Sequence, residues 1–422
     1  MTLMTAKTTL RIKGLDRQGL QQAADWLAVA VAASLPWSTS ATAILIILWL
    51  LISVPTLSPV AFKTVLLSAA GGLPVLLWAL AAFGMLWADV TWHERLGGLG
   101  GFNRLLVIPL LLAQFRRSEF GNNVLLGFLA SASALLIVSF AGTLIPGLSN
   151  HWARPELPSV PVKDYIIQSI EFLICAFVLL EFAFDRMRAD QWRSIAAIAL
   201  AALFLFNILF AVTGRTTLLI VPVLTILLGW RHFRWRGAIG AAVLVCVLGA
   251  MVWLISPSLR GRLSTSAKEL QSYETRDDLN STGLHLDFLR KSISIFQAAP
   301  IFGHGTGSIP EQFQKVTSGD TGSSGVATVN PHNQIFAVAI QIGLIGAVIL
   351  VTMWLAHFLL FCGGGLTAWI GTVVVVQNVV SSLFNSHLFD FAEGWLYVFG
   401  VGVAGGMMLR QRDARSQPEA KP

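Results

Sequence analysis

Residues 194–230 read SIAAIALAALFLFNILFAVTGRTTLLIVPVLTILLGW, and one charged side chain, Arg215, interrupts two apolar runs. An apolar run of about 20 residues is long enough to cross the hydrocarbon core of a bilayer as a helix. The short polar turn Thr213-Gly214-Arg215-Thr216-Thr217 lies between the two runs. The stretch therefore predicts two membrane-spanning helices, over 194–213 and 215–230, that meet at this turn.

The same pattern continues along most of the chain. Its 422 residues are 55% hydrophobic and 12% charged, where soluble proteins have about 45–50% apolar and about 25% charged residues. This composition excludes a soluble multidomain enzyme. We expect an all-α polytopic membrane protein of about 12 transmembrane helices, by the length rule for spans. The other predicted spans are 20–36, 39–56, 67–87, 100–115, 122–145, 164–184, 237–255, 332–361, 365–384 and 391–410.

A long polar segment, 256–331, divides the chain into membrane helices at 1–255, a loop domain, and membrane helices with a tail at 332–422. With twelve spans both termini lie on one side. Of the 29 Lys and Arg residues, 17 then fall on that side, 5 in short loops opposite and 7 in the long loop. Because basic loops stay in the cytoplasm, both termini are predicted to be cytoplasmic and the long loop to face outward. The net charge of +7 reflects this orientation and gives no reason to expect a nucleic-acid partner.

Two residues at the outer face are candidates for chemistry. Arg215 has no acidic neighbour within twenty residues, so it either extends to the lipid headgroups or forms an anion site at the start of a helix. His332 follows Asn330 and Pro331, which predicts a helix with Asn330 as N-cap and His332 in the first turn. There the helix dipole would keep the imidazole neutral and able to act as a base. The alternative is a histidine that only bonds to the surrounding structure.

The long loop supplies further candidates. Residues 284–298 predict an amphipathic helix, with His285, Arg290 and Lys291 away from its apolar stripe. We assign Lys291 to packing at the bilayer surface. The glycines of 303–308, around His304, could form a backbone nest for an anion, although a glycine-rich turn needs no ligand.

Ionisable residues in or beside the spans complete the set. Glu171 is either a proton relay or a packed structural acid, and His387, Asp390 and Glu393 precede or open the last span. No Asp-x-Asp, His-Glu-x-x-His or Cys-x-x-Cys spacing occurs. We therefore expect no metal and no cofactor.

Taken together, the chain resembles the O-antigen ligase and polymerase superfamily of bacterial envelope glycosyltransferases. The family has an arginine followed after three residues by leucine, here Arg215 and Leu219. It also has a histidine followed after ten residues by glycine, here His332 and Gly343. Residues 281–308 resemble its large periplasmic loop. The resemblance implies a C-type glycosyltransferase-like membrane fold.

The resemblance also implies the reaction. A ligase of this family moves a glycan from undecaprenyl diphosphate to lipid A–core at the periplasmic face of the inner membrane, among membrane lipids, with inversion and without metal. It implies His332 as the catalytic base and Arg215, Arg290 and Arg104 as diphosphate-binding residues. His285 and His304 become candidates for substrate contact. The family tends to carry an arginine near the start of the loop helix, where this chain has His285; whether His285 or Arg290 fills that role stays open.

Three alternatives remain. An O-antigen polymerase has two sizeable periplasmic loops, whereas the earlier outer loop here, 146–163, is short. A protein O-oligosaccharyltransferase of the same superfamily is usually a longer chain. A transporter or flippase needs polar residues at mid-membrane depth, and apart from Glu171 and a few amides the predicted spans have few.

Overall fold

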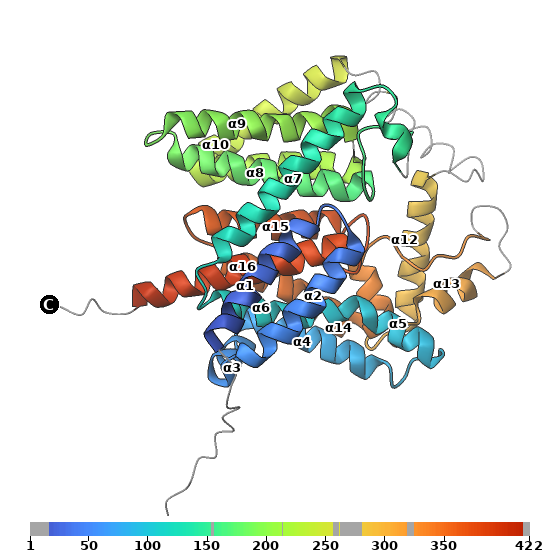
Figure 1. The fold of residues 1–422 in the computed structure, drawn as a ribbon. Coiled ribbons are helices and arrows are strands. Elements are labelled where there is room, and N and C mark those ends of the chain that lie inside the picture. Colours follow the sequence, from blue (N-terminus) through green and yellow to red (C-terminus); the bar gives the residue numbers. More distant parts are fainter. Residues whose placement is uncertain are drawn as a thin grey trace, which may run out of the picture.

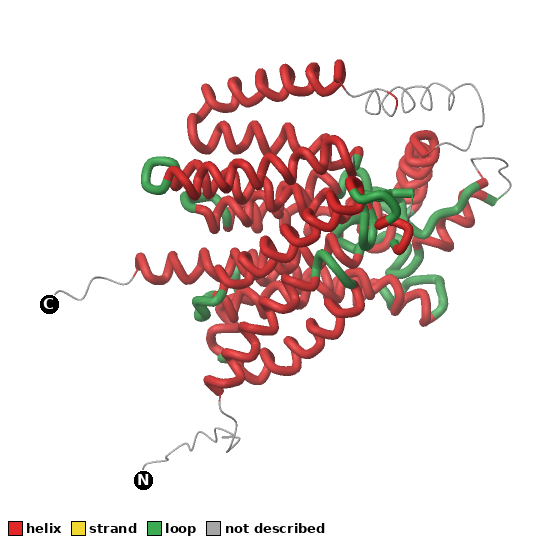
Figure 2. The backbone as a smooth tube through the Cα atoms, turned by 45° about the horizontal axis from the view of Figure 1, so that its top comes forward, coloured by secondary structure: helices red, strands yellow, loops and turns green. Residues whose placement is uncertain are grey.

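The computed structural model describes residues 17–152, 156–212, 214–255, 261, 281–318 and 325–416, and these form helices and connecting turns without strands (Figure 2). The first seven helices are α1 (Arg17–Ser34), α2 (Thr39–Ser53), α3 (Pro59–Leu66), α4 (Ala69–Gly84), α5 (Trp92–Asn103), α6 (Val107–Phe115) and α7 (Gly121–Leu144). The others are α8 (Tyr165–Arg186), α9 (Gln191–Phe206), α10 (Arg215–Ile255), α12 (Ser281–Ala298), α13 (Ile309–Thr317), α14 (Gln334–Leu360), α15 (Leu366–Ser381) and α16 (Phe391–Ser416).

The helices pack in two groups, which Figure 1 shows one above the other. Helices α8, α9 and α10 form the upper group, and α15 joins them to the lower group of α1–α6, α14 and α16. Small residues allow helices α6 and α16 to approach each other closely. Gly402, Gly405 and Gly406 of α16 lie directly against Leu111, Leu112 and Phe115 of α6, as is common where membrane helices pack.

The membrane-spanning character of the fold is confirmed, although not the number of spans. Among the described residues eight helices are long and apolar enough to cross a membrane, or nine if α3 and α4, bent by 79°, form one span. Large apolar side chains such as Ile137 and Leu144 of α7 are 69% and 76% exposed. Such a surface suits lipid rather than water. Twelve crossings remain a prediction.

Helix α10 covers two of the predicted spans, 215–230 and 237–255, and is broken between them. Arg234 has non-helical backbone angles there, φ 58° and ψ −145°. A Cβ on Gly229 would lie 2.4 Å from the carbonyl oxygen of Gly237, so the chain turns back on itself at this break. Helix α10 therefore consists of two helical segments rather than one continuous helix.

The two ends of the bundle differ in chemistry. Near the C-terminal end of α16, Asp413 forms a 2.7 Å ion pair with Arg116, and Arg410 donates to the carbonyl of Ser118. The other end of α16 lies toward α12 and α13 (Figure 1). A helix of 26 residues is about 39 Å long, which exceeds the roughly 30 Å hydrocarbon core of a bilayer.

Candidate functional site

His332 lies just before α14, and the predicted helix start is wrong by three residues. Asn333 is the N-cap, because its Oδ1 accepts from the amides of Ile335 and Phe336 at 2.9 and 3.2 Å. His332 is outside the helix with φ 52°. The side chain of Asn330 instead accepts from the amide of His332 at 2.9 Å. Asparagine commonly makes such a local turn, so the helix starts at the second asparagine.

The ring of His332 is half-buried between α14 and the loop helix α12. It stacks on Phe288, with 13° between the planes and 5.7 Å between the centroids. It also meets the ring of His285 edge to face at 4.5 Å. His285 and Phe288 are three residues apart on one face of α12. The predicted loop helix therefore exists and contributes one wall of the site.

Two asparagines hold the other side of His332. Nδ1 of His332 lies 3.1 Å from Oδ1 of Asn385, in the turn between α15 and α16. The same oxygen accepts from Nδ2 of Asn330 at 2.8 Å. Nδ2 of Asn385 donates to Oδ2 of Asp390 at 3.0 Å. No sequence pattern marks Asn385, because His332 and Asn330 are 53 and 55 residues away in the chain.

Burial is the main cause of a lowered pKa for His332, opposed by the hydrogen bond with Asn385 and the charge of Asp390. A neutral imidazole near pH 7 was expected, and the direction of the shift agrees. The dipole of α14 is not the cause of this shift, because His332 is not in the first turn of that helix.

Arg104 lies behind this cluster. Its guanidinium donates to the backbone carbonyls of Phe389 at 2.9 Å, of Asp390, and of Phe391 at 3.5 Å. These bonds hold the turn that carries Asp390. The geometry therefore gives Arg104 a supporting contact with the backbone, and nothing in it supports direct binding of a diphosphate.

The other predicted arginines are placed differently. Arg215 begins α10, and its side chain lies outside the described part of the structure. The first turn of α10 contacts α8, because the hydroxyls of Thr217 and Ser169 are 2.8 Å apart. Arg290 is exposed and two residues after Phe288, about 200° around the helix axis. Of His285 and Arg290, it is His285 that lies beside His332.

The prediction of an anion nest at 303–308 is wrong. The amides of His304 and Gly305 donate to the carbonyls of Ile340 and Gln341, both at 2.8 Å. The amide of Gly307 donates to the side chain of Gln341 at 2.8 Å. His304 places Nε2 2.9 Å from the carbonyl of Ile295, ten residues or about 15 Å along α12 from His285. This loop is thus fastened to α14, and His304 is not brought to His332.

Gly343 explains why the loop fits there. Helix α14 is broken at this residue, which has φ 66° and ψ −165°, a conformation restricted to glycine. A Cβ on Gly343 would lie 2.0 Å from the carbonyl oxygen of Ile301. The amide of Leu344 donates to Pro300 at 2.8 Å. The glycine of the histidine–glycine motif therefore anchors the segment that follows α12.

His387, Asp390 and Glu393 form a second, more buried cluster. Their ligand atoms lie within 4.8 Å of one another, so these three could hold a metal ion. Nδ1 of His387 is 3.4 Å from Asp390 and 3.5 Å from Glu393. Burial opposes protonation of His387, but its contacts with the two carboxylates outweigh burial and raise its pKa to about 9.

Glu171 has a partner that the sequence did not reveal. Its side chain is buried, and Oε1 lies 3.8 Å from Nζ of Lys163. Lys163 also donates to the carbonyl of Leu35. A paired charge is one feature of a packed structural acid, but Oε2 of Glu171 is buried without a hydrogen-bond partner among the described residues.

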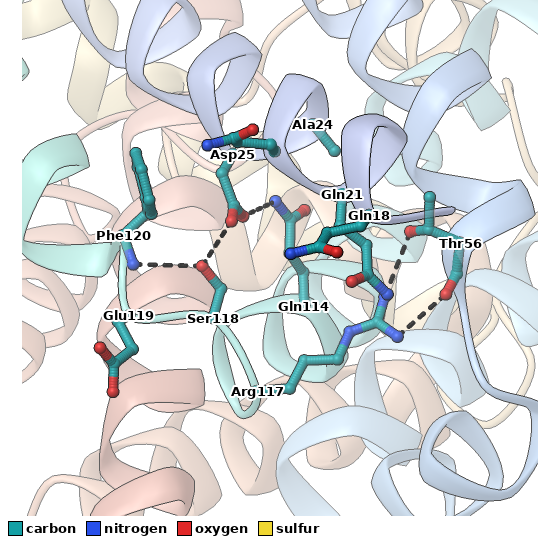
Figure 3. A pocket seen from close by; sticks show the side chains of 11 residues that line it. Gln18, Gln21, Ala24, Asp25, Thr56, Gln114, Arg117, Ser118, Glu119 and Phe120 are labelled. Atoms are coloured by element: carbon teal, nitrogen blue, oxygen red, sulfur yellow. Dashed lines mark hydrogen bonds between the residues drawn. The ribbon is translucent and has the colours of Figure 1, made fainter. Parts of the chain in front are cut away.

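A polar pocket of about 340 Å³ lies at the opposite, basic end of the bundle (Figure 3). Its buried Asp25 accepts from Gln114 and from Ser118, both at 2.7 Å. Arg117 donates to the carbonyl and hydroxyl of Thr56. These polar groups bond to one another, so the pocket offers less chemistry than the His332 cluster.

Comparison with known proteins supports one assignment. No curated protein matches the chain. Residues 199–351 match the family model described as O-antigen ligase. The match includes Arg215, α12, His332 and Gly343. This chain therefore carries the O-antigen ligase family domain over residues 199–351, which confirms the family resemblance drawn from the Arg215 and His332 motifs.

Proposed function

We propose that this membrane glycosyl-transfer enzyme is an O-antigen ligase. It transfers a glycan from undecaprenyl diphosphate to a sugar hydroxyl of lipid A–core at the periplasmic face of the bacterial inner membrane. The observation that carries the proposal is the position of His332, half-buried between the loop helix α12 and the start of α14 within the family domain.

The proposed reaction needs a base and an anion-binding group. Nε2 of His332 accepts the proton of the acceptor hydroxyl as its oxygen attacks the anomeric carbon. The bond between that carbon and the diphosphate oxygen breaks, the configuration inverts, and the diphosphate leaves as a stable anion. Arg215 holds the charge that develops on the diphosphate, because a guanidinium fits phosphate oxygens in a bidentate manner. Arg290 remains a candidate for the same role.

The lowered pKa of His332 supports this role, because a base must be unprotonated at the start of the reaction. Arg104 contributes through the turn at 389–391 rather than by contact with substrate. No step of this mechanism needs a metal, and we propose that the reaction proceeds without one.

The separation of the two ends of α16 supports the proposed orientation. The basic end with Arg116 and Arg410 suits the cytoplasmic face, because basic residues are retained there. The His332 cluster lies at the other end of the same helix; the rise of 19 residues from Phe391 to Arg410 is about 28 Å, close to the roughly 30 Å thickness of the hydrocarbon core. Both termini are then cytoplasmic and the site faces the periplasm.

The test is transfer by purified protein. Donor carrying lipid-linked glycan is mixed with lipid A–core, and the joined product is detected by gel. His332→Ala should remain folded and lose transfer, whereas the matched change of an exposed histidine, His151→Ala, should keep it. Full activity of His332→Ala would exclude His332 as the base. Movement of the lipid-linked glycan without any joined product would favour a transporter.

Arg215 is tested by a conservative change. Arg215→Lys keeps the charge and loses the bidentate fork. We expect weaker donor binding, measured as a higher KM for the lipid-linked glycan. An unchanged KM would favour the alternative in which Arg215 extends to the lipid headgroups.

A further inference from the structure

Two groups of fixed polarity determine how the side-chain amides around His332 are oriented. The carboxylate of Asp390 can only accept, and it lies 3.0 Å from one end of the Asn385 amide. That end must be the nitrogen. The backbone amide of His332 can only donate, and it lies 2.9 Å from one end of the Asn330 amide. That end must be the oxygen.

These amide orientations allow only one tautomer of the neutral His332 imidazole. With its nitrogen toward Asp390, Asn385 presents Oδ1 to Nδ1 of His332 at 3.1 Å. The amide of Asn330 donates to the same oxygen at 2.8 Å, while Ser386 donates to the oxygen of Asn330 at 2.8 Å. An amide oxygen accepts and never donates, so Nδ1 of His332 must carry the proton. In a neutral imidazole the lone pair is then on Nε2.

We infer that Asn385, oriented by Asp390, is a positioning residue that fixes the tautomer and the ring orientation of His332. The inference deepens the proposed function and rests on it for the catalytic consequence, because only a base on Nε2 needs this tautomer. Asp390 is itself placed by Arg104, which donates to the carbonyls on both sides of it and to its own. This relay of contacts therefore runs from Arg104, the residue directly after α5, through the α15–α16 turn to His332.

The two nitrogens of the His332 ring have different roles. Nδ1 is engaged by the protein, and Nε2 is the nitrogen with a lone pair for substrate. Stacking on Phe288 and the edge contact with His285 restrict rotation of the same ring from the α12 side. Where a histidine binds a metal, removal of the partner on its second nitrogen commonly costs about 10- to 100-fold in activity, and we expect an effect of this size for His332.

The first experiment compares two substitutions of nearly equal size. Asn385→Leu removes the acceptor, and Asn385→Asp keeps an oxygen that accepts from Nδ1, while its second oxygen faces Asp390 and the two carboxyl groups share a proton. We expect kcat to fall about 10- to 100-fold in Asn385→Leu with an unchanged KM for the lipid-linked donor. Asn385→Asp should restore most of the loss. The control is Asn123→Leu, which replaces an exposed asparagine in the first turn of α7. Wild-type kcat in Asn385→Leu would overturn the inference.

The second experiment measures His332 without relying on activity. Diethyl pyrocarbonate reacts with neutral imidazole, and mass spectrometry of the peptide with His332 gives the rate as a function of pH. Asn385 acts on this ring by a hydrogen bond, Asp390 and His387 act on it by charge, and His285 faces it from α12. Asp390, His387 and His285 are retained in the two variants. The apparent pKa of His332 should fall in Asn385→Leu and stay closer to the wild-type value in Asn385→Asp, because the acceptor for Nδ1 is kept and the new carboxyl group shares a proton with Asp390.

A third arm tests the relay itself. Asp390→Asn allows the amide of Asn385 to turn over, so kcat should fall in the wild-type background. In the Asn385→Leu background the same change should cost less than in the wild type, because the part that acts through Asn385 is already lost, while the direct effect of the Asp390 charge on His332 is removed in both backgrounds. Additive losses would overturn the role of Asp390.

The outcomes separate the two hypotheses. If the apparent pKa of His332 follows the predicted order but His332→Ala still transfers glycan, the proposed base is wrong and the positioning contact stands. If His332→Ala is inactive but neither variant moves the pKa or kcat, the base stands and the positioning role is overturned.

Discussion

The glycine of the histidine–glycine motif gives the sharpest structural prediction. In Gly343→Ala the new Cβ would lie 2.0 Å from the carbonyl oxygen and 2.3 Å from the carbonyl carbon of Ile301. Both atoms belong to the backbone, so no side-chain rotation can relieve the overlap. A residue held in this glycine-only conformation costs about 1–3 kcal/mol, and overpacking adds about 1–3 kcal/mol. The change should therefore cost about 2–6 kcal/mol.

The consequence extends to the site. The loop at 300–307 is fastened to α14 by the amides of Leu344, His304 and Gly305. If it moves away from Gly343, α12, which ends at Ala298, loses its C-terminal attachment and, among the described residues, is held only by its packing on α13 and α14. Phe288 would then be held less firmly against His332. We expect transfer to fall at least tenfold together with stability, since a cost of this size is a large part of the stability of an ordinary domain.

The assay compares two glycine-to-alanine changes. Thermal unfolding in detergent and glycan transfer are measured for Gly343→Ala and for Gly100→Ala in α5. A Cβ at Gly100 meets nothing within 4 Å, and alanine favours a helix over glycine by up to about 1 kcal/mol. Gly100→Ala should unfold at the same or a higher temperature and stay active. Wild-type Tm and transfer in Gly343→Ala would refute the anchoring role of the glycine.

Three further predictions concern charge and metal. Because burial lowers the pKa of His332 below its ordinary 6.5, kcat/KM should be constant from pH 8 down to about 6.5 and fall only below it; a fall between pH 8 and 6.5 would contradict a neutral buried base. The pKa of His387 is raised to about 9 in the folded protein. The charged ring therefore adds about 3 kcal/mol to the free energy of unfolding. This contribution is complete below about pH 6.5 and is lost as the pH rises through about 9. The Tm difference between wild type and His387→Gln should therefore be large at pH 6 and small at pH 10, and equal Tm values at pH 6 would show that the charge contributes nothing. Transfer should be undiminished in EDTA, and inhibition reversed by a divalent ion would instead indicate a cation among His387, Asp390 and Glu393.

The start of α14 shows where prediction from sequence failed. Asn330 followed by proline is a strong local signal for an N-cap. Three residues later a second asparagine can do the same, and Asn333 does so. The side chain of Asn330 is engaged by the amide of His332 and by the hydroxyl of Ser386. Ser386 is 56 residues away, so a contact between distant segments decided between two locally similar starts.

The sequence by itself determined the helical, membrane-spanning character of the chain, the loop helix, and the selection of Arg215 and His332 as candidates. Backbone groups in lipid must bond within a segment, so apolar runs become helices whatever their neighbours. The amphipathic stripe of 284–298 likewise follows from helical periodicity alone. Arg215 and His332 were identified because single polar residues stand out at the edges of apolar runs.

Only the tertiary structure decided what surrounds His332. Its partner Asn385 is 53 residues away, and Arg104 is 286 residues from the Asp390 carbonyl that it anchors. Arg104 was expected to bind diphosphate, yet its donors are directed at backbone carbonyls. Hydrogen bonds depend on distance and direction, and no spacing in the sequence contains either for residues that meet only after helices pack. The residue types were therefore evident from the sequence, and their roles were decided by packing.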